Sequence, residues 1–177
     1  RTIKIKMNNM SKNQPISSVD VIPSDTINIP EPGSYLSGAS STNNLTLTTA
    51  GAKFVDGTSS VGKYQVVAGG DVVIAGAEMA LITSVTSNTT LTLQAPGITA
   101  AAPYNYKIHR GNGGIPGTNE GNSGYSLYVG GTGDVTAITQ QGEEIVMKNI
   151  GNASFIPQQV IRVKAAGTTA SDIKALS

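Results

Sequence analysis

The chain has 177 residues and a formal net charge of +1 at pH 7, with 13% charged residues and no cysteine. Near-neutrality leaves no field to attract nucleic acid or an anionic membrane, and the lack of cysteine excludes disulfides and thiolate metal sites. A charge-poor chain with 21 glycines and abundant Thr, Ser and Asn favours short strands joined by tight turns. Copies of a protein with so few surface charges repel one another weakly, which suits a permanent assembly.

Residues 1–14 are predicted to form an N-terminal arm. The arm carries Arg1, Lys4, Lys6 and Lys12, and no apolar signal-peptide core follows them. Its segment Thr2–Lys6 alternates polar and apolar residues with period two, as a half-buried strand does. We expect the arm to become ordered only against a neighbouring molecule.

The next segments are predicted from their turn residues. Residues 19–32 contain three prolines and end in Glu31-Pro32-Gly33, so we expect an extended, edge-type segment. Residues 34–110 hold strand-like runs separated by turns, which predicts a five-strand meander. The expected turns lie at Gly69-Gly70, Gly76, Ser87-Asn88 and Pro96-Gly97.

The C-terminal part reads as strand again. Residues 111–123 are mostly Gly, Asn, Pro and Ser, which is typical of a linker. From Tyr125 onward strand signals resume, and over Thr169–Leu176 a final strand is favoured over a short helix. The most apolar stretch, Asp71–Val85, is interrupted by Glu78 and is too short to span a bilayer.

Two separated groups of motifs resemble one family. The first is VIPSDTINIP at residues 21–30, and the second is LYVGGTGDV at residues 127–135, followed by FIP, IRV and AGTTASDI up to Ile173. Together they resemble the spike-base proteins found on the heads of gene transfer agents and in tailed-phage structural gene sets. The resemblance covers residues 15–33 and 124–177, about two-fifths of the chain, and about ninety residues separate the two halves.

The intervening residues resemble a second module. Their strand pattern, with GD-x-V at residues 70–73 and TTLTL at residues 89–93, is similar to a small β-barrel common in phage structural proteins. The expected fold is therefore all-β. A discontinuous sandwich-like or jelly-roll-like base module (15–33 with 124–177) carries an inserted five-strand barrel (34–110).

The resemblance implies a role in a virion. We expect a non-enzymatic, homo-oligomeric component of a phage head, assembled in the bacterial cytoplasm, that contacts the major capsid protein or other virion proteins and carries a spike or fibre. Capsid cement and a tail or baseplate subunit are the structural alternatives. The alternative from another class is a glycan-binding module whose tyrosines stack on sugars. Those tyrosines would be Tyr35, Tyr64, Tyr104, Tyr106 and Tyr125.

Candidate catalytic residues have simpler interpretations. His109 is the only histidine, so it cannot form a two-histidine metal site, and we expect it to be exposed or at an interface. Glu143 and Glu144 are adjacent, which in a strand sends them to opposite faces, and we interpret them as a turn and a strand start. The glycines of Gly130–Asp134 precede a strand-like run rather than a helix, so they predict a turn and not a phosphate loop.

No catalytic, cofactor-binding or metal-binding residue is predicted. The residues expected to matter support strand geometry in the motifs. They are Pro23, Asp25, Gly130, Gly131 and Asp134. Asp25 and Asp134 are each expected to cap a local turn through the side chain.

Overall fold

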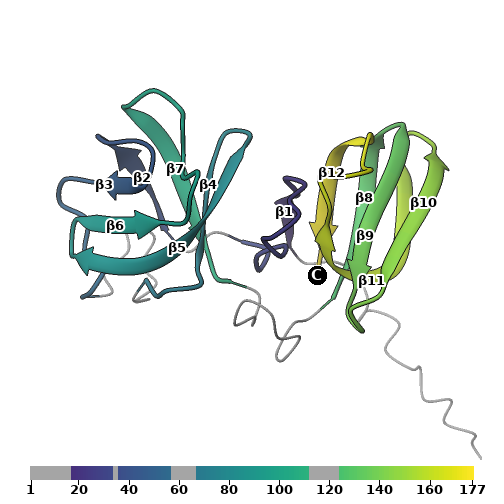
Figure 1. Ribbon diagram of the computed structural model, residues 1–177, viewed down its shortest axis with the longest axis horizontal. Helices are drawn as coiled ribbons and strands as arrows, with labels where there is room; N and C mark the ends of the chain where they lie inside the picture. Colours follow the sequence, from purple (N-terminus) through teal and green to yellow (C-terminus); the bar gives the residue numbers. More distant parts are fainter. Residues whose placement is uncertain (1–16, 34–35, 57–66, 112–123) are drawn as a thin grey trace, which may run out of the picture.

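The computed structural model describes residues 17–33, 36–56, 67–111 and 124–177. These residues form twelve strands and no helix, arranged in two six-stranded antiparallel sheets (Figure 1). The predicted all-β class is confirmed. The arm (1–14) lies outside the described residues, and so does the predicted linker apart from Gly111.

The first sheet, called the base module here, joins both ends of the chain. Its strand order is β1-β12-β8-β11-β9-β10. The strands are β1 (Ser18–Asp20), β8 (Tyr125–Gly131), β9 (Gly133–Thr139), β10 (Glu144–Ile150), β11 (Ser154–Val163) and β12 (Ser171–Leu176). The long strand β11 pairs with β8 through its first residues and with β9 through its last, with register shifts around Val160. The sheet therefore folds over on itself around β11.

The second sheet, called the barrel module here, lies entirely between the two parts of the base module. Its order is β2-β7-β4-β5-β6-β3. The strands are β2 (Leu36–Ser40), β3 (Thr46–Thr48), β4 (Val72–Ala75), β5 (Glu78–Ser87), β6 (Thr90–Leu93) and β7 (Tyr104–His109). The predicted five-strand meander is wrong in two respects. A sixth short strand, β3, pairs with β6, and β7 inserts between β2 and β4.

The barrel is nearly closed because its two edge strands meet. The amide of Ser41, just after β2, donates to the Thr48 carbonyl of β3 at 2.8 Å. The buried Ser40 hydroxyl accepts from the amides of Thr42 and Thr48, each at 3.2 Å, and donates to the Thr42 carbonyl. One serine side chain thus satisfies backbone groups of both edges, which removes the free edges that a flat sheet would expose.

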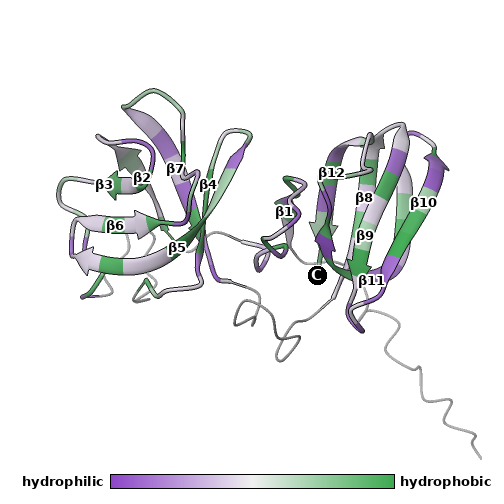
Figure 2. Cartoon of the chain, viewed as in Figure 1, coloured by the Kyte–Doolittle hydropathy of each residue, from purple (hydrophilic) through white to green (hydrophobic). Residues whose placement is uncertain are grey.

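Each module has its own apolar core. The base core contains Leu127, Val129, Val135 and Val160, and the barrel core contains Leu47, Phe54, Val73, Ile82, Leu91 and Ile108. Figure 2 shows hydrophobic and hydrophilic residues alternating along strands of the base module, as period two requires when only one face of a strand is buried. The alternation seen in the sequence therefore decides which side chains enter each core.

The chain crosses between the modules twice, and the two crossings contact each other. On the way out, the Glu31 amide donates to the Arg110 carbonyl at 2.9 Å. On the way back, the Nδ1 atom of His109 lies 3.3 Å from the Glu31 carbonyl oxygen. Next to the crossings, a groove of about 780 Å³ lies between β1 and the barrel strands β2, β4 and β7, with Asp20 and Lys107 among its lining residues.

Candidate assembly surface

The PSDT motif forms a loop that closes one end of the base module. The Ser24 hydroxyl accepts hydrogen bonds from the amides of Thr26 at 3.3 Å and Ile27 at 3.0 Å, which makes a local turn directly after Pro23. The Asp25 carboxylate instead accepts from the amide of Ala166 at 3.1 Å. The prediction that Asp25 caps its own turn is therefore wrong. Ser24 does so, and Asp25 ties the loop to the other end of the sequence.

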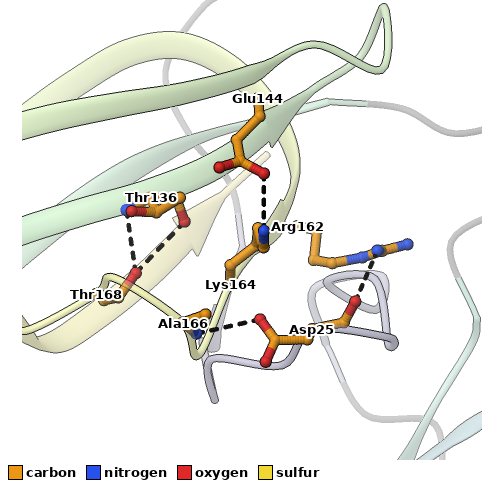
Figure 3. Close-up of polar contacts among 7 residues, drawn as sticks. All are labelled: Asp25, Thr136, Glu144, Arg162, Lys164, Ala166 and Thr168. Atoms are coloured by element: carbon orange, nitrogen blue, oxygen red, sulfur yellow. Dashed lines mark hydrogen bonds and ion pairs between the residues drawn. The ribbon is translucent and has the colours of Figure 1, made fainter.

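Arg162 of β11 binds the same loop through two hydrogen bonds. Its Nε donates to the Asn28 side-chain oxygen at 2.8 Å. Its Nη1 donates to the Asp25 carbonyl at 3.0 Å (Figure 3). The backbone continues the contact, because the amides of Ser24 and Ile29 donate to carbonyls of Val163 and Ile161, both at 2.8 Å. Residues about 135 positions apart in sequence thereby become neighbours.

The GTTA motif ties the segment before β12 to β9. The Thr168 hydroxyl accepts from the Thr136 amide at 3.0 Å and donates to the Thr136 carbonyl at 3.3 Å. Nearby, Lys164 forms an ion pair with Glu144 at 2.7 Å (Figure 3). Gly167 adopts a φ of +88°, and a Cβ there would lie 2.6 Å from the Thr136 hydroxyl. The motif residues therefore hold the segment before β12 against β9.

The glycine motif connects β8 to β9 through Thr132 alone. Gly130 and Gly131 lie within β8 rather than in the predicted turn, and β8 and β9 are separated in the sheet by β11. A Cβ on Gly131 would lie 2.0 Å from the Ser171 hydroxyl oxygen, and one on Gly130 would lie 2.9 Å from the Asp172 Cβ. The close approach of β12 therefore restricts Gly130, which faces the Cβ and the backbone of Asp172, more than Gly131, where the Ser171 hydroxyl can rotate away.

Asp134 stabilises a distant bulge rather than its own turn. Its carboxylate accepts from the Lys148 ammonium at 2.8 Å and from the Asn149 amide at 2.9 Å, where β10 shifts register and Asn149 has a φ of +55°. The Lys148 hydrogen bond lowers the pKa of Asp134, and the Asn149 amide adds to this effect. The prediction of a local cap is wrong, because Asp134 lies inside β9 and its side chain bonds to residues of the paired strand β10.

Aromatic side chains are exposed on the outward face of the base module. Tyr128 of β8 and Phe155 of β11 are directly opposite each other and are 37% and 56% exposed. The row continues across the sheet to Lys174 of β12 and Asp20 of β1, which form an ion pair. We call Tyr128 and Phe155 the aromatic pair. Large exposed aromatics are typical of surfaces that bind protein.

The residues considered for catalysis lie in different parts of the fold, His109 at the end of β7 and Glu143 and Glu144 where β10 begins. Of the two expectations for His109, exposed or at an interface, the first is wrong, because the residue is 5% exposed, and it lies at the junction between the two modules. Burial lowers its pKa, which favours the neutral imidazole. Glu144 begins β10 as predicted, with Glu143 in the preceding turn. Across the described residues, no group of three His, Cys, Asp or Glu side chains is arranged to hold a metal ion.

The tyrosines predicted to stack on sugars do not form an exposed platform. Tyr104, Tyr106 and Tyr125 are buried in the two cores. Burial raises the pKa of Tyr125 to about 12. Tyr35 and Tyr64 lie outside the described residues. Among the described residues, the exposed aromatics are Tyr128 and Phe155 instead, so this prediction is corrected at the three buried positions.

Two important features were missed from the sequence. The outward position of Phe155 follows from alternation, since Ile156 beside it is buried, and this signal was available. The role of Arg162 gave no such signal, because its partners at Asp25 and Asn28 are remote in sequence.

In the described part of the chain, no helix is long and apolar enough to cross a membrane. Comparison with protein-family models, with curated proteins and with solved structures gives no match.

Proposed function

We propose that this chain is a virion structural protein of a tailed phage, a homo-oligomeric component of the head surface that forms the base of a spike or fibre. The observation that carries the proposal is the aromatic pair. It places two large exposed side chains side by side on a sheet face whose neighbouring positions hold an ion pair. In this arrangement an apolar centre meets a polar rim, as in protein–protein interfaces.

The resemblance motifs add a second line of support. Their polar residues bond to one another and to the backbone, as Asp25 does to Ala166 and Thr168 does to Thr136. A motif built this way preserves the shape of a module, which is what an assembly protein must present to its neighbours. The barrel module, inserted at the junction, extends from the base and is available to contact other virion proteins.

The test is to locate the chain on particles. Density-gradient-purified particles from the cell that encodes the chain are probed with an antibody to it and imaged by cryo-EM. We expect the chain in symmetric rings on the head surface. Even coverage of capsomers would identify capsid cement, and density on the tail would identify a baseplate subunit. Absence from purified particles would refute a virion role.

A further inference from the structure

Strand β10 is an edge whose inward side chains are incompletely covered. It is the last strand of the base sheet and pairs only with β9. Ile145 and Met147 point inward and pack against the base core, yet both stay half-buried. Core residues at the centre of the same sheet, such as Leu127, are fully buried. One further strand beside β10 would complete the burial and pair its free backbone groups.

The N-terminal arm contains a segment of matching pattern. In an extended Thr2–Lys6, Ile3 and Ile5 would lie on one face and Lys4 and Lys6 on the other. Residues 144–147 of β10 alternate in the same way, with Ile145 and Met147 inward and Glu144 and Val146 outward. Beside β10, the two arm isoleucines would therefore extend the inner apolar row, and the lysines would lie on the face of Glu144.

Charge favours the same contact. Residues 1–16 carry four basic residues and no acidic one, a formal charge of +4. The base module, taken as residues 17–33 and 124–177, carries seven acidic and four basic residues, a formal charge of −3. Glu143, directly before β10, is exposed and forms no ion pair within the described part of the chain. Opposite charges across an interface promote association and fix its register.

The arm is long enough to leave its own module. The arm leaves the base module just before Ser17, whose backbone amide and carbonyl form hydrogen bonds with Ser177 at 3.3 and 3.2 Å. Ser17 lies beside β1, at the opposite end of the strand order from β10. Sixteen extended residues reach about 50 Å. A compact module of some 70 residues has a radius of gyration of about 11 Å. The arm can therefore reach a neighbouring molecule.

The geometry points to strand donation between copies: residues 2–6 of one copy add as a strand to β10 of a second copy. Each copy then offers one donor and one acceptor, a head-to-tail contact that generates a ring where the rotation between copies closes and a filament where it does not. The inference rests on the homo-oligomer of the proposed function and adds a second contact to the surface around the aromatic pair.

Cysteine cross-linking tests the contact directly, because the chain has no cysteine of its own. Lys4→Cys and Val146→Cys copies of different mass are mixed and treated with a short bismaleimide. We expect a mixed cross-linked dimer, because outward side chains on neighbouring strands lie about 5 Å apart. Thr86→Cys, exposed on β5 of the barrel module, replaces Val146→Cys as the control and should give no such product. Cross-linking within single chains of the Lys4→Cys/Val146→Cys double variant, at monomer mass, would overturn donation to a second copy.

A charge-matched pair of variants tests the strand itself. Ile3→Glu/Ile5→Glu should raise the dissociation constant of the oligomer about a hundredfold, as measured by light scattering across a dilution series. Asn8→Glu/Asn9→Glu adds the same charge outside the segment and should assemble like the parent. If Ile3→Glu/Ile5→Glu assembles like the parent, the strand donation is wrong and the virion role stands. A monomeric parent would refute the inference together with the homo-oligomer, whereas the virion role is decided separately on purified particles.

Discussion

Substituting Gly133 by alanine is expected to destabilise the base module severely. Gly133 has a φ of +152°, and a Cβ there would lie 2.4 Å from the Ala170 nitrogen and 2.7 Å from the Ala170 Cα. The positive φ costs a residue with a Cβ about 1–3 kcal/mol. Relief of the clash must separate Asp134 from Thr169 and Ala170, which share three hydrogen bonds. At about 1 kcal/mol for each bond, the expected total is about 4–6 kcal/mol.

Gly151→Ala in the same module is the matched control. Gly151 has no positive φ, and the nearest atom to a Cβ there is the Ser154 hydroxyl oxygen at 3.7 Å, so its effect should stay within about 1 kcal/mol. The assay is urea unfolding combined with amide hydrogen exchange, which reports on the two modules separately. We expect Gly133→Ala to lose protection in β9 and β12 while the barrel strands keep theirs. Equal unfolding midpoints for the two variants would refute the close approach of β9 and residues 169–170.

Three further predictions concern polar contacts. Arg162→Ala should lower the free energy of unfolding by about 2–3 kcal/mol because the PSDT loop loses two hydrogen bonds. Its control Lys164→Ala breaks an exposed ion pair and should lower the free energy of unfolding by less than about 1 kcal/mol. Ser40→Ala should cost about 1–3 kcal/mol in thermal unfolding because two backbone amides lose their acceptor, and Ser41→Ala, with an exposed hydroxyl, should change little. Because the pKa of Asp134 is lowered in the folded state, its carboxylate stabilises the fold at pH values above the unfolded-state pKa. This contribution should disappear as the pH falls from about 5 to 2. Asp134→Asn should therefore make the free energy of unfolding less dependent on pH over that range. An unchanged pH dependence for Asp134→Asn would contradict its role at the β10 bulge.

The sequence by itself determined the class of the fold and which side chains of a strand point toward the core. Period-two alternation depends only on neighbouring residues, so it correctly placed Leu127 and Val129 in strand and predicted a final strand where β12 lies. Alternation also separates Phe155 from Ile156, which is why the outward position of Phe155 could have been found without coordinates, whereas its place opposite Tyr128 could not.

Only the tertiary structure decided which strands pair and what the polar motif residues bind. Every strand has the same period, so alternation cannot say that β7 inserts between β2 and β4 or that β11 serves both β8 and β9. Likewise, an aspartate beside a turn has a local donor within reach, yet Asp25 and Asp134 bond to Ala166 and Asn149. Packing of the sheet brings these partners together, and it depends on residues far apart in sequence.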